Sequence, residues 1–399
     1  MNNSILYISY DGILEPLGQS QVLAYLNRLA VDWHIHLISF EKPEDWMNVT
    51  EREQITKDLA AAGIVWHPLR YHKKPSALAT AWDISCGIIV GLWLVLRYRL
   101  RIVHARSYVP SVIALALKRL TRVRYIFDMR GFWADERVDG GLWAGEGRLY
   151  HLAKWFEKRF ILSADCVVSL TNSAVLEMRT FSYLQGRMPN FEVITTCTDL
   201  ELFKGADPEK AGKNDQPFIL GYVGSVGTWY LFDDVLKFFK KLRKQVPGAV
   251  LHILNRGDHD YILEKISIAG ISTESFQLDT VDHAAVVQAM QKMNAGIFFY
   301  KPTYSKIATA PTKLGEFLGC GVPCISNIGV GDIQGILEGE RVGIVLKDFS
   351  ETDLDHGVES LIELTRQPDI QQWCRQAAVK YFSLEDGVAA YNRIYNELD

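Results

Sequence analysis

The sequence lacks most features that are typical of exported proteins, of proteins with a structural metal site and of membrane-spanning proteins. Its six cysteines include no C-x-x-C pair, which argues against a disulfide framework and a structural zinc site. Residues 1–12 have neither the charged nor the apolar region of a signal peptide. The longest apolar run, Ile84–Leu96, is shorter than the ~20 residues that cross a bilayer. These absences favour a protein of the reducing cytoplasm that does not span a membrane.

What the sequence does contain is ordinary globular material. With 399 residues, of which 48% are hydrophobic and 23% charged, the chain is long enough for two cores of typical domain size. No short-period repeat or low-complexity tract interrupts it. We therefore expect two domains.

The net charge of −4 is divided unevenly, because basic residues outnumber acidic ones only in the first half of the chain. Much of this basic excess follows the apolar run, at Arg97, Arg99 and Arg101. Basic residues beside an apolar helix are typical of segments that contact anionic lipid headgroups. They are equally typical of a solvated helix end, where cations complement the helix dipole. The sequence leaves both interpretations open.

Apolar segments typical of buried strands alternate with helical stretches in two series. In the first series we expect strands at Ile5–Ser9, Ile35–Phe40, Ile102–His104, Tyr125–Asp128 and Cys166–Leu170. The second series is expected to have strands at Phe218–Val223, Val250–Leu254 and Gly296–Tyr300, with a helix over Phe232–Gln245. This alternation predicts two doubly wound α/β domains. The polar, proline-containing segment Asp207–Pro217 predicts the linker between them.

Ligands in such sheets bind beyond the carboxyl ends of the strands, so the following turns are the candidate sites. In the first half, the first turn is the loop Asp11–Ser20, which contains Gly18 and ends at Ser20, a predicted helix cap. A later turn places Arg106 at a strand end. The turn after Asp128 concentrates charge in Arg130, Asp135 and Glu136. These residues predict a polar site, unless Asp128 only caps a helix and Arg130 pairs with Asp135.

The second half offers two glycine-bearing turns and a helix start. Gly224–Ser225 and Asn255–Arg256 follow its first two strands, and glycine there lets the backbone approach a pyrophosphate closely. In Pro311–Ile325 (PTKLGEFLGCGVPCI), a proline at the first helical position leaves the next amides, those of Thr312 and Lys313, free to bind an anion. Glu316, one turn later, can accept both hydroxyls of a ribose. The alternative is a short surface helix.

Together these segments resemble the retaining GT-B glycosyltransferases of family four, and the resemblance covers nearly the whole chain. It implies two facing Rossmann-like domains with a cleft between them, the second of which holds a sugar nucleotide. Glu316–Ile325 matches the second half of the family motif of two glutamates separated by seven residues, together with the strand that follows. Ala308 stands in place of the first glutamate, and Pro311–Lys313 is similar to a P-T-K variant.

A second departure concerns the charge on the diphosphate. Many relatives place an arginine and a lysine after the first strand of the second domain, where this sequence has Gly224–Ser225 and Thr228–Tyr230. The resemblance then leaves Lys313, the helix amides, Arg256 or Arg130 to neutralise the leaving group. In the first domain, the segment beginning at Asp128 replaces the family's strand-end histidine.

The resemblance implies a metal-independent retaining glycosyltransferase without a cofactor. We expect Lys313, Asp128 and Arg130 to be catalytic. We expect the donor to be bound by Gly18, Gly224, Ser225, Asn255, Arg256, Pro311, Thr312, Lys313 and Glu316, and the acceptor by Arg106, Asp135 and Glu136. The alternatives are an epimerase of sugar nucleotides on the same fold and a catalytically weak nucleotide-sugar-binding protein. The triplets Asp258–Asp260 and Asp353–Asp355 are interpreted as helix starts or chance matches rather than as metal sites.

The expected domains are 1–206, which binds the acceptor, and 207–380, which binds the nucleotide sugar, with a helix over 381–399 that packs back on the first domain. A UDP-sugar is the favoured donor, and the acceptor is a glycan or a lipid-linked glycan in bacterial surface polysaccharide or glycolipid assembly. The expected location is the cytoplasm, with peripheral contact at the anionic inner face of the cytoplasmic membrane. No nucleic acid partner is expected.

Overall fold

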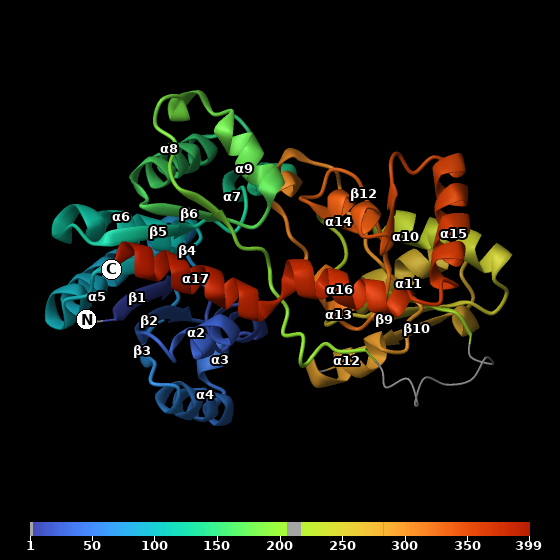
Figure 1. The fold of residues 1–399 in the computed structure, drawn as a ribbon, viewed down its shortest axis with the longest axis horizontal. Helices are drawn as coiled ribbons and strands as arrows, with labels where there is room; N and C mark the ends of the chain where they lie inside the picture. The colour runs from blue at the N-terminus through green and yellow to red at the C-terminus, as the bar shows by residue number, and fades with distance from the viewer. Residues whose placement is uncertain (1–2, 206–216, 282) are drawn as a thin grey trace. The chain divides into compact units, whose positions relative to one another are not determined.

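The computed structural model describes residues 3–205, 217–281 and 283–399. The chain forms two compact units, each a parallel sheet between helices (Figure 1). Unit 1 comprises Met1–Thr195 and Leu384–Asp399, and unit 2 comprises Thr196–Ser383. The predicted doubly wound α/β fold is confirmed for both units.

Unit 1 has a seven-stranded sheet in the order β3-β2-β1-β4-β5-β6-β7. Its strands are β1 (Ser4–Ser9), β2 (His34–Glu41), β3 (Val65–Arg70), β4 (Ile102–Arg106), β5 (Arg124–Asp128), β6 (Cys166–Ser169) and β7 (Phe191–Val193). All pairs are parallel, and β1 lies between β2 and β4, with Tyr7 opposite both Leu37 and His104. The strand order reverses at β1 and β4, so the carboxyl ends of these strands form the ligand-binding edge typical of such sheets.

The helices of unit 1 cover both faces of this sheet (Figure 1). They are α1 (Pro16–Gly18), α2 (Ala24–Leu29), α3 (Pro43–Trp46), α4 (Val49–Ala61), α5 (Ser76–Tyr98), α6 (Tyr108–Thr121), α7 (Trp133–Asp139), α8 (Arg148–Ser163), α9 (Asn172–Arg179) and α17 (Leu384–Leu398). Helical backbone begins at Pro16 and continues through a π-helical turn, Gln19–Leu23. The prediction that Ser20 caps this helix is therefore wrong, because Ser20 lies inside the π turn.

Helix α5 is longer than the apolar run suggested. It has 23 residues, and by length and composition Ala77–Tyr98 could cross a membrane. One face nevertheless packs inside unit 1, where the missing side chains of Gly87 and Gly91 make room for Ile113 and Leu117 of α6. A Cβ atom at either glycine would lie 2.5 Å or 2.9 Å from those side chains. Close packing on α6 thus accounts for both glycines in an otherwise apolar helix.

The last helix, α17, packs against α2 within unit 1. Trp33 donates a hydrogen bond from Nε1 to Oδ1 of Asn392 at 2.6 Å. The hydroxyl of Tyr395 lies 2.7 Å from Nδ1 of His104. The C-terminal helix therefore supplies side chains to the interior of unit 1.

Unit 2 has a six-stranded parallel sheet in the order β10-β9-β8-β11-β12-β13. Its strands are β8 (Ile219–Val223), β9 (Val250–Leu254), β10 (Phe276–Asp279), β11 (Ala295–Ile297), β12 (Cys324–Asn327) and β13 (Gly343–Leu346). Its helices are α10 (Phe232–Gln245), α11 (His259–Ile268), α12 (His283–Met290), α13 (Thr312–Gly319), α14 (Ile333–Gly339), α15 (Glu351–Thr365) and α16 (Ile370–Phe382).

The boundaries between the units differ from the expected ones. Unit 2 begins at Thr196 instead of residue 207, because Leu200 and Phe203 are buried in its core. The guanidinium of Arg375 also donates to the carbonyl oxygens of Leu200 and Phe203. At the other end, α16 continues past residue 380, so the chain returns to unit 1 at Leu384. The expected linker lies almost entirely in residues 206–216, outside the described residues.

Candidate functional site

The start of α13 in unit 2 is built for an anion. Pro311 has extended backbone angles and is the N-cap, so the helix begins at Thr312, one residue later than predicted. The amide of Leu314 bonds to the carbonyl oxygen of Pro311, which leaves the amides of Thr312 and Lys313 to point out of the first turn. Free amides and the helix dipole together attract negative charge.

The side chain of Lys313 sits beside this helix start in a cage of aromatic rings. Its Nζ atom lies 4.6 Å from the ring centroid of Tyr230, 5.4 Å from that of Tyr222 and about 6 Å from those of Phe298 and Tyr300. Only 8% of Lys313 is exposed, and within the described part of the chain Nζ has no hydrogen-bond partner. Ring faces attract a cation but supply no counter-charge. A buried ammonium without a hydrogen-bond acceptor is costly, so this environment favours the binding of an anion.

Gly224 lies against the same ammonium. A Cβ atom at this position would be 3.0 Å from Nζ of Lys313, and the φ of Gly224 is 109°, in the region that favours glycine. The carbonyl oxygen of Gly224 accepts a hydrogen bond from Nδ2 of Asn255 at 3.0 Å, while Oδ1 of Asn255 accepts from the amide of Asp258 at 2.8 Å. Asn255 thus ties the turn after β8 to the turn after β9.

Glu316 follows one turn along α13. Burial raises the pKa of its carboxyl group to about 7, although the nearby Lys313 ammonium acts in the opposite direction. The side chain is partly accessible to solvent. Its carboxyl group can therefore change charge near neutral pH while it remains able to meet a ligand.

The other predicted donor residues of unit 2 are less enclosed. Ser225 and Arg256 are exposed in the turns after β8 and β9, and the carbonyl oxygen of Ser225 accepts a hydrogen bond from Tyr222 at 2.6 Å. The structure therefore brings Gly224, Lys313 and Asn255 together but leaves Arg256 on the surface. The donor-binding roles of these residues remain predictions.

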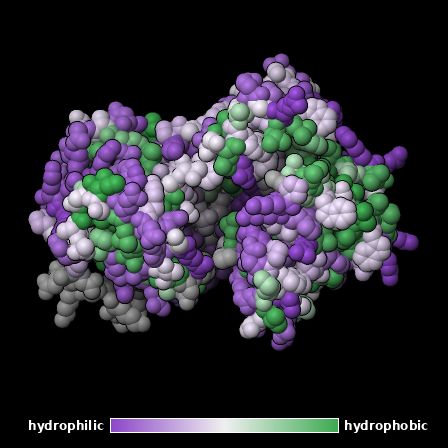
Figure 2. All heavy atoms as spheres, turned by 180° about the vertical axis from the view of Figure 1, so that it is seen from behind, coloured by the Kyte–Doolittle hydropathy of each residue, from purple (hydrophilic) through white to green (hydrophobic). Residues whose placement is uncertain are grey.

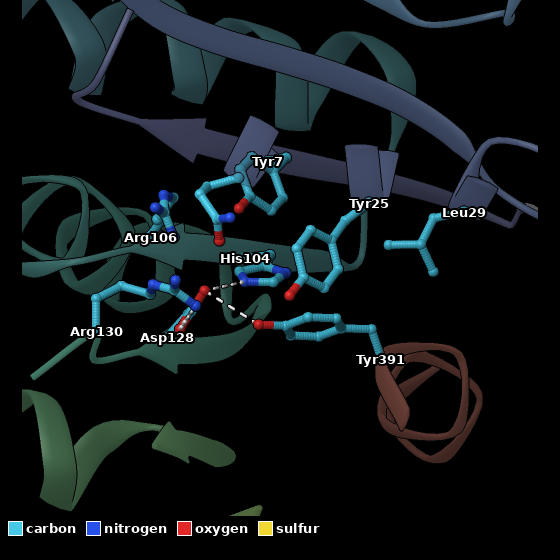
Figure 3. Close-up of a pocket in the computed structure, with 9 residues that line it drawn as sticks. Tyr7, Tyr25, Leu29, His104, Arg106, Asp128, Arg130 and Tyr391 are labelled. Atoms are coloured by element: carbon cyan, nitrogen blue, oxygen red, sulfur yellow. Dashed lines mark hydrogen bonds and ion pairs between the residues drawn. The ribbon is translucent and has the colours of Figure 1, made fainter. Parts of the chain in front are cut away.

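In unit 1, the strand ends of β4 and β5 enclose a charged cluster around Asp128 (Figure 3). The Oδ2 atom of Asp128 accepts a hydrogen bond from Tyr391 at 3.2 Å and lies 3.5 Å from Nε2 of His104. Oδ1 lies 4.0 Å from the guanidinium of Arg130. Burial opposes ionisation of Asp128, but Arg130 and His104 outweigh it, so the pKa of Asp128 lies below its ordinary value. The carboxylate is ionised and paired.

His104 is the neutral partner in this cluster. Burial lowers the pKa of the imidazole, while Asp128 opposes that effect. The cavity among these side chains has a volume of about 10 Å³, close to one water molecule. A sugar does not fit there, and only 1% of Asp128 is exposed. Asp128 instead faces Arg130 in this structure, and a contact between Asp128 or Arg130 and a sugar remains a prediction.

Backbone conformation marks the same strand ends. Ser107, directly after β4, has a φ of 73°, and Arg130, just after β5, has a φ of 57°. Left-handed backbone is costly for residues other than glycine and concentrates at functional sites. The strained turns hold Arg106 and Arg130 at the edge of the sheet where ligands bind.

Arg106 is 5% exposed, and its Nε atom has no hydrogen-bond partner within the described residues, although it lies 3.6 Å from Oδ2 of Asp11. The loop Asp11–Ser20, which contains Gly18, is fixed by hydrogen bonds to Glu41. The buried carboxylate of Glu41 accepts hydrogen bonds from the amides of Ile13 and Leu14 at 3.0 and 3.2 Å. A Cβ atom at Gly18 would lie 2.0 Å from a backbone oxygen of this loop, so only glycine fits.

The two acidic residues predicted to bind the acceptor lie on α7. The carboxylate of Asp135 accepts hydrogen bonds from Tyr150 and Lys154, both at 2.9 Å. Asp135 thus links α7 to α8, and the alternative pair between Arg130 and Asp135 is wrong, because Arg130 faces Asp128. Glu136 is partly buried in the first turn of α7. Its contact with an acceptor remains a prediction.

The structure also accounts for the two acidic triplets. Among residues 3–205, 217–281 and 283–399, no group of three or more His, Cys, Asp or Glu side chains is arranged to hold a metal ion. Asp353 accepts hydrogen bonds from three backbone amides before α15, and Asp355 pairs with Lys241 at 2.6 Å. Asp258 is the N-cap of α11, without a side-chain cap bond.

Sequence reasoning missed several residues of the unit 1 cluster, chiefly His104, Tyr391 and Tyr395. Tyr7 belongs to the same group, since its ring centroid lies 4.4 Å from that of His104 (Figure 3). His104 ends a predicted strand, but only its neighbour Arg106 was predicted to belong to a site. The tyrosines of α17 carry no local signal, because only the fold brings this helix to β4.

Comparison with known proteins gives a consistent family assignment. The family model of glycosyl transferases group 1 matches residues 203–380, and that of the glycosyl transferase 4-like domain matches residues 20–190. Among curated proteins, none matches the sequence.

Three solved structures illustrate the likeness of the fold. Sucrose-phosphate synthase from Thermosynechococcus elongatus has a TM-score of 0.74 at 15% identity, with 99% of each chain covered. Anabaena HepE in complex with UDP and glucose has a TM-score of 0.69 at 14% identity, also with 99% of each chain covered. The lipopolysaccharide outer core galactosyltransferase WaaB has a TM-score of 0.64 at 13% identity, with 99% of this chain and all of that chain covered. The chain therefore belongs to the GT-B glycosyltransferases of the group 1, family-four type.

Proposed function

We propose that this protein is a metal-independent retaining glycosyltransferase that uses a UDP-sugar. The observation that carries the proposal is the buried ammonium of Lys313, which has no hydrogen-bond partner within the described residues and lies beside the helix amides at the start of α13. A diphosphate supplies hydrogen-bond acceptors and negative charge for this ammonium. The carboxylate of Glu316, one turn later on the same helix, can then accept hydrogen bonds from the ribose hydroxyls.

The role of Lys313 in catalysis follows from where charge develops. As the bond between the sugar's anomeric carbon and the diphosphate oxygen breaks, negative charge grows on the diphosphate. Lys313 and the amides at the start of α13 are fixed before the reaction, so they stabilise this charge without reorganisation. Exclusion of water by the aromatic cage strengthens the interaction.

Retention of configuration needs no nucleophile from the protein. The acceptor hydroxyl forms the new glycosidic bond on the face that the diphosphate leaves, and its proton passes to the departing phosphate oxygen. In this proposal Arg130 contacts the reacting groups, while Asp128 holds Arg130 in position through their ion pair. Arg106, Asp135 and Glu136 serve the acceptor side, Asp135 through its bonds to α8.

The choice of donor and pathway is supported by two of the similar structures. HepE was solved with UDP and with glucose, which favours a UDP-sugar here. WaaB is named for the lipopolysaccharide outer core, which favours a glycan or lipid-linked acceptor in bacterial surface polysaccharide or glycolipid assembly. We propose no resident cofactor and no nucleic acid partner.

Helix α5 supports a peripheral location at the inner face of the cytoplasmic membrane. Five large apolar side chains of α5 are 55–72% exposed: Leu78, Trp82, Ile89, Trp93 and Leu96. Their spacing places them on one face of the helix, and Figure 2 shows apolar side chains gathered over this end of unit 1. Arg97, Arg99 and Arg101 follow, all exposed. An apolar stripe beside basic residues suits an anionic lipid surface.

One incubation separates this function from its alternatives. The protein is mixed with UDP-glucose labelled in the sugar, and the products are separated after defined times. Transfer to an acceptor, or slow hydrolysis without one, supports a glycosyltransferase. Appearance of an isomeric sugar nucleotide instead supports an epimerase, and unchanged donor that nevertheless binds supports a nucleotide-sugar-binding protein.

A further inference from the structure

Unit 1 contains a second, much larger cavity with a volume of about 750 Å³. It lies between the N-terminal halves of α5 and α6 and the helices α7 and α8. Most of its wall is apolar, and the residues that form this wall include Ile84, Val109, Val112, Trp133, Trp143, Leu149, Leu152, Ala153 and Phe156. A cavity of this size and composition can enclose a substantial hydrocarbon group.

The inner end of this cavity, which we call the cleft, is polar and lies at the carboxyl ends of β1 and β4. Asp11 follows β1, and Arg106 and Ser107 lie at the end of β4; all three line the cleft. Arg106 is almost fully buried, with its Nε atom lacking a hydrogen bond among the described residues. The cavity therefore extends from its apolar part to the edge of the sheet, where we place the acceptor.

The outer end opens beside exposed apolar side chains. On α8, Leu149 and Leu152 line the cleft and are each 52% exposed, and Trp155 is 47% exposed. On α5, Ala77 and Ala81 line the cleft next to the exposed residues Leu78 and Trp82. The apolar stripe of α5 is thus continuous with the cleft wall. Patches of this kind on soluble proteins mark sites that meet other apolar matter.

Charge around the patch distinguishes a membrane from a protein partner. Basic residues flank α5 at both ends, with Lys73 and Lys74 before it and Arg97, Arg99 and Arg101 at its end, all of them exposed. This arrangement complements a surface of anionic lipids, each basic residue adding to the attraction. A lipid in an anionic membrane has a hydrocarbon chain that can occupy the apolar part of the cleft.

We propose that the cleft binds the hydrocarbon chain of a lipid-linked acceptor, with the acceptor's polar head at Arg106 and Ser107. The inference rests on the proposed glycosyl transfer and specifies its acceptor. A chain that passes from the membrane between α5 and α8 brings the acceptor hydroxyl to the strand ends of β1 and β4. The protein then selects acceptors by their chain as well as by their sugar.

The test measures chain binding directly with dodecyl phosphate, used below its micelle concentration, and methyl phosphate as the head-group control. Titration calorimetry of the full-length protein should show binding of dodecyl phosphate with a negative heat-capacity change, the mark of apolar burial. Methyl phosphate should bind at least tenfold more weakly. Equal binding of the two phosphates would show that a phosphate site alone is present and would overturn the proposal.

Two variants of cleft residues test where the hydrocarbon chain of the ligand binds. Ala153→Trp fills the cleft from α8, whereas Ala61→Trp, on exposed α4, is the matched control. We expect Ala153→Trp to weaken dodecyl phosphate binding at least tenfold and Ala61→Trp to leave it unchanged. A second variant, Leu152→Glu, adds a charge to a half-exposed wall residue and should have the same effect as Ala153→Trp. Unchanged binding by both cleft variants would contradict the proposal.

UDP binding is measured in parallel, because it belongs to unit 2 and should be unaltered in all these variants. Absence of dodecyl phosphate binding by the wild type, with its UDP binding and donor hydrolysis intact, would overturn the lipid inference alone. Absence of donor turnover in the wild type would overturn the proposed function, whatever the lipid result. Failure of dodecyl phosphate to bind, combined with capture of a protein at the patch, would overturn the inference in favour of a protein partner.

Discussion

The Nζ atom of Lys313 lies 4.6 Å from the ring centroid of Tyr230, which stands close to the position where many relatives place a cation. The aromatic ring cannot neutralise a phosphate. It can, however, orient and desolvate the ammonium of Lys313, which carries the positive charge needed to do so. We therefore expect the charge that faces a bound diphosphate to come from α13 rather than from the turn after β8.

The first prediction concerns the pH dependence of nucleotide binding. Glu316 has a pKa of about 7, and in the proposed site the ribose hydroxyls donate to its ionised form, so UDP affinity should rise as pH increases through 7. Between pH 6 and pH 8 the ionised fraction grows from about a tenth to about nine tenths, so affinity should change by up to tenfold. Calorimetric titrations at several pH values measure this change.

The variant Glu316→Gln is the control for that experiment. It cannot ionise, so it should keep only the pH dependence of the nucleotide itself. At pH 8 it should bind UDP more weakly by ~1.5–3 kcal/mol, the usual worth of a hydrogen bond to a charged group. Wild-type affinity in this variant would remove Glu316 from the site.

The second prediction concerns the stability of unit 1. Asp128→Asn leaves the buried Arg130 without its carboxylate and should reduce the free energy of unfolding by ~3–5 kcal/mol at pH 7. Tyr391→Phe removes only one hydrogen bond and should cost ~1 kcal/mol. Denaturant titrations compare the two variants with the wild type.

The sign of the pH effect follows from the pKa of Asp128, which is lower in the folded chain than its ordinary value. Its ionisation therefore stabilises the fold above the unfolded pKa of about 3.9, and this contribution is lost as the pH falls further. The difference between wild type and Asp128→Asn should shrink below pH 4. A difference that stays constant down to pH 3 would show that Asp128 is not the paired carboxylate.

Much of the architecture follows from the sequence because most strands of a parallel sheet are buried on both faces. β1, for example, is buried along its whole length and reads as an apolar run. β3, β7 and β10 were missed since they are only partly buried. β13 was missed although it is mostly buried, because it has only four residues. The unit boundary was misplaced because Leu200 and Phe203, which carry no strand or helix pattern, pack into unit 2.

For the candidate sites too, the sequence predicted some residues and missed others. Arg106, Asp128 and Lys313 were predicted because strand ends and helix starts can be located from local patterns. The partners that give them their properties come from distant segments. Tyr391 reaches Asp128 only through the packing of α17, and the rings around Lys313 come from different strands and turns. Contacts at such separations leave no mark in one sequence.

The third prediction concerns the membrane. Replacement of Arg97, Arg99 and Arg101 by Gln should weaken binding to vesicles of anionic phosphatidylglycerol, each charge contributing ~1 kcal/mol. Vesicle sedimentation with and without added salt measures the loss. A control of equal charge change replaces three lysines on unit 2, namely Lys240, Lys244 and Lys347, all of them exposed. Equal loss in both variants, or no vesicle binding by the wild type, would contradict the assignment of this surface.

The fourth prediction concerns metal ions. If Lys313 and the amides of α13 supply the positive charge for the leaving group, as we propose, turnover of the UDP-sugar should be unchanged in EDTA. The assay compares initial rates in EDTA with those in added Mg²⁺. Abolition of activity by the chelator would instead direct attention to the carboxylates of Asp258 and Asp260.

Kinetic analysis of Lys313→Ala tests the central claim most directly. An interaction that strengthens as charge develops acts on the transition state, so kcat should fall ~100-fold or more while the affinity for the UDP-sugar changes much less. Lys301→Ala, which removes an exposed lysine of the same unit, should retain wild-type kinetics. If Lys313→Ala instead turns over within a few-fold of the wild type, the account is contradicted and the leaving-group role passes to Arg256 or Arg130.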